Sequence, residues 1–134
     1  MKVLFVCTGN TCRSPMAQAI CEAQTEHCAD SAGLGVATPE PVSDAALQAL
    51  NELGIEGFSH LSRQITPKDV EEADQIYVMT HMHKSILTAV CPEFADKIHL
   101  LGGEKEISDP YGGSLEQYRA CCQEIEGCIR RELC

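Results

Sequence analysis

A chain of 134 residues, with 44% hydrophobic and 22% charged side chains, has the size and composition of one globular domain. This balance excludes a disordered or fibrous protein. Ten lysine and arginine residues against 20 acidic residues give a net charge of -10, which disfavours nucleic acid and anionic membranes as partners because both repel it at long range. We expect a single domain over residues 1–134 that acts as a monomer.

The nine cysteines do not follow the pattern of a disulfide-rich secreted protein. Their number is odd, no signal peptide precedes them, and the opening apolar run, residues 3–7, is too short to span a membrane. No Cys-x-x-Cys pair occurs, and no histidine lies at zinc-like spacing from the last four cysteines, Cys121, Cys122, Cys128 and Cys134. We expect reduced thiols, a cytoplasmic protein and no metal, with these late cysteines packed in or on a helix.

Apolar residues alternate between strand spacing and helix spacing along the chain. Short apolar runs predict strands at residues 3–7, 29–32, 76–79 and 98–101. Helical spacing behind capping residues predicts helices over residues 14–27, 43–53, 66–73, 80–91 and 114–133. Buried strands that alternate with amphipathic helices indicate an α/β fold, with a parallel sheet covered by helices on both faces.

The starts and core-facing sides of the first helices can be named from the sequence. Ser14 is expected to cap the first helix, with Pro15 at its first position, where the missing N–H costs nothing. Its core-facing residues are expected to be Met16, Ile20 and Ala23. After a loop rich in glycine and proline, Ser43 is expected to cap the second helix and Gly54 to end it. Thr66 starts the brief third helix.

The last two helices have equally clear starts. Thr80 is expected to cap the fourth, with Met82, Ile86 and Val90 facing the core. Ser114 begins a capping box for the final helix. The inward residues of that helix are Leu115, Tyr118, Cys122, Ile125, Ile129 and Leu133. Ligands of parallel sheets bind beyond the carboxyl ends of the strands, so chemistry is expected in the loops after residues 6, 79 and 101.

The first of these loops, residues 7–14, reads Cys-Thr-Gly-Asn-Thr-Cys-Arg-Ser and runs directly into a helix. Backbone N–H groups and the positive end of the helix dipole bind an anion at such a position, and Gly9 and Asn10 tolerate the positive φ of a wrapped loop. The same potential is expected to lower the pKa of the Cys7 thiol and make it a nucleophile at neutral pH. Arg13 carries a planar guanidinium that can hold two phosphoryl oxygens.

Residues 7–14, together with the late Asp109-Pro110-Tyr111-Gly112, resemble the low-molecular-weight protein tyrosine phosphatase family. The resemblance covers essentially the whole chain. It implies a single-domain, three-layer α/β fold with a four-stranded parallel sheet, in which Cys7 is the nucleophile, Arg13 the phosphate clamp and Asp109 the general acid. The residues expected to bind phosphate or a similar oxyanion are Thr8, Gly9, Asn10, Thr11, Cys12, Arg13 and Ser14. Asn10 would organise the loop, Ser14 would donate to the thiolate, and no cofactor or metal is implied.

The chemistry explains why an acid is needed opposite the nucleophile. The leaving group requires a proton, which Asp109 can donate, and the same carboxylate can then deprotonate the water that hydrolyses the phosphocysteine. An Asp-Pro turn is the alternative interpretation of Asp109, which its pairing with Cys7 and Arg13 disfavours. For Tyr111, an aromatic wall at the pocket entrance and simple core packing both stay open.

Thr11 bears on the choice of substrate. The tyrosine-specific members of the family usually have a bulky aliphatic residue four positions after the nucleophile, whereas this chain has Thr11. Together with Thr80-His81-Met82-His83-Lys84 and residues 109–114, this feature resembles the bacterial protein-arginine phosphatase branch. A small hydroxyl-bearing wall suits a planar, polar phosphoguanidinium, with which Asp109 can pair. We expect hydrolysis of phosphoarginine in proteins, with protein-tyrosine phosphatase activity as the alternative.

Other residues suggest redox regulation and argue against a metal site. Cys12 lies five residues after Cys7 on the same tight loop, which predicts that their sulfurs can form a disulfide under oxidation. His81 and His83 lie two apart at a helix start, so capping or solvent roles are favoured over metal binding.

Two functions from other classes remain as rivals. Thiol-coupled arsenate reductases use a similar anion loop but require a cysteine pair after the third strand, and here only Cys91 follows residues 79–83. A non-catalytic phosphoprotein-binding module would lack the nucleophile or the acid, and this chain has both Cys7 and Asp109.

Overall fold

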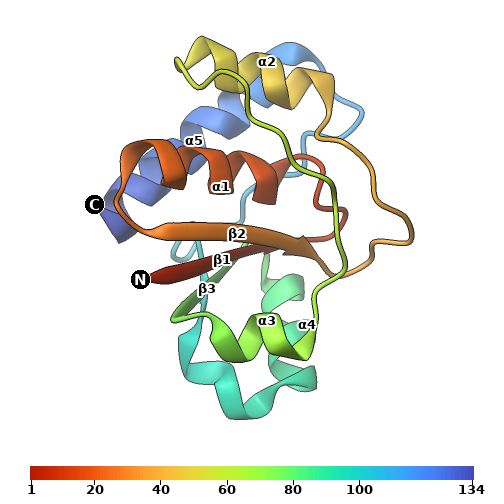
Figure 1. Cartoon of the computed structure of the whole chain (residues 1–134), viewed down its shortest axis with the longest axis vertical. Helices are drawn as coiled ribbons and strands as arrows, with labels where there is room; N and C mark the ends of the chain where they lie inside the picture. Colours follow the sequence, from red (N-terminus) through yellow and green to blue (C-terminus); the bar gives the residue numbers. More distant parts are fainter.

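A four-stranded parallel sheet is the centre of the computed structural model, which describes residues 1–134 (Figure 1). The strands are β1 (Lys2–Cys7), β2 (Cys28–Gly33), β3 (Gln75–Val78) and β4 (Ile98–Leu100), and they lie in the order β2-β1-β3-β4. All three pairings are parallel. The four predicted strands are confirmed, each within one residue of its expected bounds.

Helices cover both faces of the sheet. They are α1 (Arg13–Gln24), α2 (Asp44–Glu52), α3 (Pro67–Glu72), α4 (His81–Val90) and α5 (Leu115–Leu133), with a 3-10 segment, η1 (Pro92–Lys97). Figure 1 shows α1, α2 and α5 on one face and α3 and α4 on the other. Strand β1 contributes to both cores, since Val3 and Phe5 pack on the α1 side while Leu4 and Val6 pack on the α3 side. The predicted three-layer α/β fold is confirmed.

The predicted helix caps are confirmed, with one exception. The side chains of Ser43, Thr66, Thr80 and Ser114 each accept a backbone N–H bond at a helix start. Gly54 follows the end of α2 with a φ of +86°. The prediction for Ser14 is wrong, because α1 begins at Arg13 behind Cys12 and has no side-chain cap. The Ser14 hydroxyl instead contacts the Cys7 thiol.

The predicted core-facing stripes of α1 and α4 need correction. In α1, Met16 and Ile20 are fully buried, but Ala23 is exposed. The last buried residue of this helix is Cys21. In α4, the buried residues are His83 and Leu87. The residues predicted to face the core are exposed instead: Met82 by 61%, Ile86 by 43% and Val90 by 71%. A rotation by one residue, about 100°, separates the two assignments, because a polar side chain takes a core position that an apolar pattern does not register.

The strand order places the loop after β1 at a topological switch point. The connection from β1 leads to β2 on one side, while β3 lies on the other side of β1. Crevices at such points, beyond the carboxyl ends of the strands, are the usual ligand sites of parallel sheets. No helix combines the length and the apolar character needed to cross a lipid bilayer.

Candidate active site

The loop between β1 and α1 is held in its wrapped shape by Asn10. Its φ of 56° is the left-handed conformation, in which Asn is among the few residues tolerated. Its backbone N–H donates to Cys7 Sγ at 3.3 Å, and its Nδ2 donates to Ser14 Oγ at 2.8 Å. Its Oδ1 accepts from His60 Nε2 at 2.8 Å and from the backbone N–H of Arg63 at 3.1 Å. Asn10 is fully buried, so these bonds satisfy its polar atoms and fix the loop.

A close approach of two backbone segments requires glycine at the end of β2. A Cβ atom on Gly33 would lie 2.6 Å from the carbonyl oxygen of Thr8 and 2.6 Å from Val36 Cγ2. The chain after Gly33 pairs with the loop, since the N–H groups of Leu34 and Gly35 donate to the carbonyls of Cys7 and Thr8 at 3.0 Å each. The loop after β2 therefore supports one side of the anion loop.

Cys7 and Ser14 form the innermost contact of the site. The distance from Cys7 Sγ to Ser14 Oγ is 2.9 Å, and both residues are buried. Burial raises the pKa of the Cys7 thiol, and this effect outweighs the hydrogen bonds from Ser14 and Asn10 and the charge of Arg13, which lower it. The net direction is opposite to the sequence prediction, which considered the helix dipole without the depth of burial. Thiolate formation therefore depends on these neighbouring donors.

The N-terminus of α1 is left open toward the same point. No side chain caps it and no acidic residue lies in its first turn. Its first N–H groups and the positive end of its dipole are therefore available to an anion above Cys7.

Arg13 connects the anion loop to the loop that carries Asp109. Its side chain is only 6% exposed; Nη1 donates to the carbonyl of Ile107 at 2.8 Å, and Nη2 lies 3.7 Å from Asp109 Oδ2. The N–H of Ile107 donates to the carbonyl of Met79 at 2.9 Å, which ties this loop to the end of β3. The Asp109 side chain is 55% exposed and accepts a bond from the N–H of Tyr111 at 3.0 Å. The structure thus brings Cys7, Arg13 and Asp109 together.

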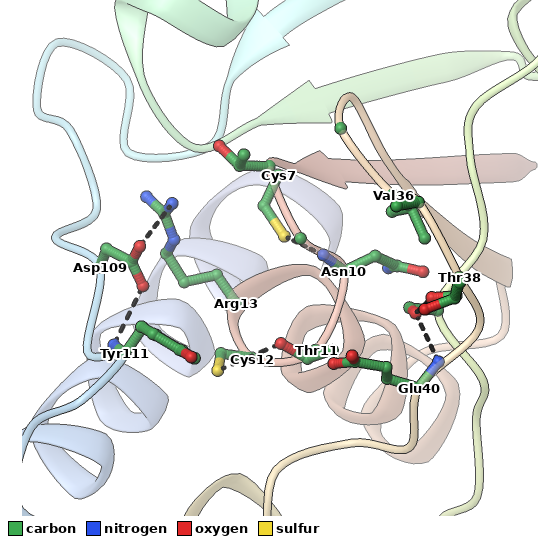
Figure 2. A pocket seen from close by; sticks show the side chains of 15 residues that line it. Cys7, Asn10, Thr11, Cys12, Arg13, Val36, Thr38, Glu40, Asp109 and Tyr111 are labelled. Carbon is green, nitrogen blue, oxygen red and sulfur yellow. Dashed lines mark hydrogen bonds and ion pairs between the residues drawn. The ribbon is translucent and has the colours of Figure 1, made fainter.

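These residues line a pocket of about 380 Å³ (Figure 2). The predicted site residues that line it are Cys7, Thr8, Gly9, Asn10, Thr11, Cys12, Arg13, Asp109 and Tyr111. Ser14 lies beneath the pocket surface and is fully buried. Tyr111 is 78% exposed and lies at the rim, which excludes core packing as its role.

One part of the pocket lies mainly on the loop after β2 and was not predicted from the sequence. Ser62 comes from the segment between α2 and α3, and the loop after β2 contributes Gly35, Val36, Ala37, Thr38 and Glu40. Its glycines and prolines predict a loop but do not indicate a role. The available signal was its position, since it leaves the carboxyl end of a strand adjacent to β1.

His83 is also part of the site's support, which corrects the expectation of a capping or solvent role. It is 1% exposed, and its Nε2 lies 2.8 Å from Thr8 Oγ1. Burial and the nearby charge of Arg13 lower the pKa of His83 to about 4, so the ring is neutral at pH 7. No group of three or more His, Cys, Asp or Glu side chains is arranged to hold a metal ion.

The two loop cysteines are both free thiols. Cys12 Sγ lies 3.4 Å from the hydroxyl of Tyr118 and 3.6 Å from that of Ser43. Its pairing with Cys7 under oxidation stays a prediction. In the region that would need a cysteine pair for arsenate reduction, Cys91 is a single buried thiol at the end of α4.

Comparison with known proteins assigns the chain to a family. The family model described as low molecular weight phosphotyrosine protein phosphatase matches residues 2–133. A protein-arginine-phosphatase of Geobacillus stearothermophilus is 39% identical, over 97% of this chain and 92% of that protein. The low molecular weight protein-tyrosine-phosphatase PtpB of Staphylococcus aureus is 35% identical, over 96% of this chain and 94% of that protein.

A solved structure adds a chemically informative relative. It is a mutant of the YwlE arginine phosphatase with serine in place of a cysteine, and its active-site serine is phosphorylated. It is 35% identical to this chain, covers 98% of it and 92% of its own length, and superposes with a TM-score of 0.89. With a family model that spans nearly all residues and relatives of this similarity, the chain belongs to the low molecular weight phosphotyrosine protein phosphatase family.

Proposed function

We propose that this protein is a phosphoprotein phosphatase that hydrolyses phosphoarginine through a phosphocysteine intermediate. The observation that carries the proposal is the meeting of a thiol, a guanidinium and a carboxylate in one pocket at a helix N-terminus: Cys7, Arg13 and Asp109. A nucleophile, an anion clamp and a proton donor are the three groups that phosphoryl transfer without a metal requires.

In the first step, Cys7 loses its proton to water and its sulfur attacks phosphorus in line. The S–P bond forms while the P–N bond to the arginine side chain breaks. Arg13 holds two phosphoryl oxygens and stabilises the charge that shifts during transfer. Asp109, in its acid form, donates a proton to the leaving nitrogen, which departs as the NH2 group of the regenerated arginine guanidinium.

In the second step, water hydrolyses the phosphocysteine. Asp109, now a carboxylate, takes a proton from the attacking water, the O–P bond forms and the S–P bond breaks. Inorganic phosphate leaves and Cys7 returns as a thiolate stabilised by the Ser14 hydroxyl at 2.9 Å and the Asn10 N–H at 3.3 Å. The phosphorylated serine in the YwlE mutant supports a covalent intermediate at the corresponding position.

The choice of phosphoarginine is supported by the pocket wall. Thr11 places a small hydroxyl-bearing side chain on this wall, where a planar guanidinium with N–H donors finds an acceptor. The name of the Geobacillus relative is consistent with this choice.

Phosphotyrosine hydrolysis is the second candidate. It is favoured by Tyr111, an exposed aromatic ring at the rim that offers a wall to a phenyl group, and by the name of the Staphylococcus relative.

The decisive experiment compares kcat/KM for phosphate release from matched phosphoarginine and phosphotyrosine peptides. Wild type and Thr11→Ile are measured in parallel, with Cys7→Ser as the blank. We expect wild type to prefer phosphoarginine and Thr11→Ile to shift the preference toward phosphotyrosine by about 10-fold to 100-fold, the usual range for one altered pocket contact. A wild-type preference for phosphotyrosine would assign the second function, and release that survives Cys7→Ser would contradict the covalent mechanism.

The proposed setting is the reducing cytoplasm, which nine free cysteines suit. We infer that the partners are phosphorylated protein side chains, that inorganic phosphate occupies the loop as product, that nucleic acid and membranes are not partners, and that the protein acts as a monomer without a metal.

A further inference from the structure

Glu40 places a second carboxylate at the rim of the pocket. It lines the cavity, and Figure 2 shows its side chain pointing toward Thr11, on the side opposite Asp109 and Tyr111. The carboxylate of Asp109 is engaged by Arg13 and by the N–H of Tyr111. The carboxylate of Glu40 forms no hydrogen bond and no ion pair, so its acceptor capacity is left for a ligand.

The backbone of Glu40 is rigidly held. Its N–H donates to Ser62 Oγ at 2.8 Å and its carbonyl accepts from the N–H of Ser62 at 2.8 Å. Pro39 precedes it and Pro41 follows it, and a following proline confines a residue to extended backbone. Ser62 is buried, so these two bonds anchor the exposed Glu40 to the interior of the domain. The side chain is therefore presented to the pocket from a fixed base, which reduces the entropy cost of binding through it.

The charge of Glu40 has opposite consequences for the two candidate substrates. Phosphotyrosine carries only negative charge near the pocket, and an unpaired carboxylate at the rim repels it. Phosphoarginine carries a guanidinium directly next to its phosphate, and the N–H groups of this cation can donate to a carboxylate. One side chain can thus favour the first class of substrate and disfavour the second.

We infer that Glu40 is a specificity-determining residue whose carboxylate accepts hydrogen bonds from the guanidinium of phosphoarginine, across the pocket from Asp109. The inference rests on the proposed function and extends it. It predicts that selectivity depends on the loop after β2 as well as on Thr11.

The test is kcat/KM for matched phosphoarginine and phosphotyrosine peptides with wild type, Glu40→Gln and Glu56→Gln. The amide keeps the size of the side chain and removes its charge. Glu56 is exposed and does not line the pocket, so Glu56→Gln makes the same change in net charge elsewhere. We expect Glu40→Gln to lower the phosphoarginine value about 10-fold, as for loss of a charged hydrogen bond, and to leave the phosphotyrosine value equal or higher. Glu56→Gln should change neither value.

Peptides with and without a lysine beside the phosphorylated residue test whether Glu40 binds the phosphorylated side chain or its neighbour in the peptide. A loss in Glu40→Gln that occurs only with the flanking lysine, whatever the phosphorylated side chain, would show that Glu40 binds the neighbouring residue, and would overturn the inference. Equal values for wild type and Glu40→Gln on phosphoarginine would overturn the inference and leave the proposed function intact. A wild type that hydrolyses phosphotyrosine but not phosphoarginine would overturn both.

Discussion

Replacing Ser14 by alanine tests how the buried thiol becomes a nucleophile. Ser14 Oγ accepts a hydrogen bond from Asn10 Nδ2 at 2.8 Å, so its own proton is free to point at Cys7 Sγ, 2.9 Å away. Ser14→Ala removes this donor and leaves the backbone N–H groups of residue 14 and of Asn10, the latter at 3.3 Å from the sulfur. Because the hydrogen bond lowers the pKa of the thiol against the effect of burial, its loss raises that pKa further.

The size of the effect follows from the type of bond. A hydrogen bond to a charged group contributes about 1.5–3 kcal/mol, and the backbone donors that remain favour the lower end. At pH 7 this corresponds to about a 10-fold lower thiolate population, since 1.4 kcal/mol is about a factor of ten.

The assay is the rate of alkylation of Cys7 by iodoacetamide as a function of pH, with the modified peptide identified by mass spectrometry. We expect the alkylation midpoint to move to higher pH in Ser14→Ala, and kcat/KM for phosphate release to fall by a similar factor at pH 7. Ser59→Ala, at an exposed position, serves as the matched control. An unchanged midpoint in Ser14→Ala, with the variant folded, would refute the view that this hydroxyl stabilises the thiolate.

Three other variants or conditions test separate features. Gly33→Ala should destabilise the fold by about 1–3 kcal/mol in urea unfolding, because its Cβ would lie 2.6 Å from the Thr8 carbonyl. The control Gly127→Ala, at a helical position with open space, should stabilise the fold by about 0.5–1 kcal/mol. Equal stability of the two variants would contradict the close approach at Gly33. The pKa of His83 is lowered from 6.5 to about 4, so the unfolded chain binds its proton first and stability should decline as pH falls from about 6.5 to 4. His83→Gln should show a shallower decline, and an equal one would indicate that another group titrates. Peroxide should oxidise Cys7 to a sulfenic acid, which the Cys12 thiol converts to a disulfide with release of water, and dithiothreitol should restore activity. Sulfinic acid on Cys7 beside a free Cys12 thiol would contradict the view that the disulfide protects Cys7 from further oxidation.

The features predicted correctly from the sequence depend on local interactions. Four hydroxyl side chains cap their helices because each needs only the N–H three residues ahead: Ser43, Thr66, Thr80 and Ser114. The strands were predicted from apolar runs of a few residues, and the anion loop after β1 was predicted from residues 7–14 alone.

The features predicted wrongly depend on partners far along the chain. His83 occupies the core position of α4 because it contacts Thr8, 75 residues earlier, and this contact exposes Met82 and Ile86. The pKa of Cys7 was predicted from a helix dipole that the sequence implies, whereas its burial depends on how the loops pack around it. The role of Glu40 becomes visible only when Ser62 fixes the loop after β2 beside the pocket.

The charged side chains that line the pocket have different expected roles in binding phosphate and in selecting the substrate. Arg13 is its one cation, and Glu40 and Asp109 are its two carboxylates. We therefore expect a phosphate dianion to be bound by Arg13 together with the N–H groups of the loop and the open N-terminus of α1, which attract it without further cations. The carboxylate of Glu40 would oppose such a dianion if it carried no positive charge of its own, whereas Asp109 enters the first step in its neutral acid form. A phosphorylated side chain that brings a guanidinium removes this opposition, so the acidic rim becomes a filter in favour of phosphoarginine.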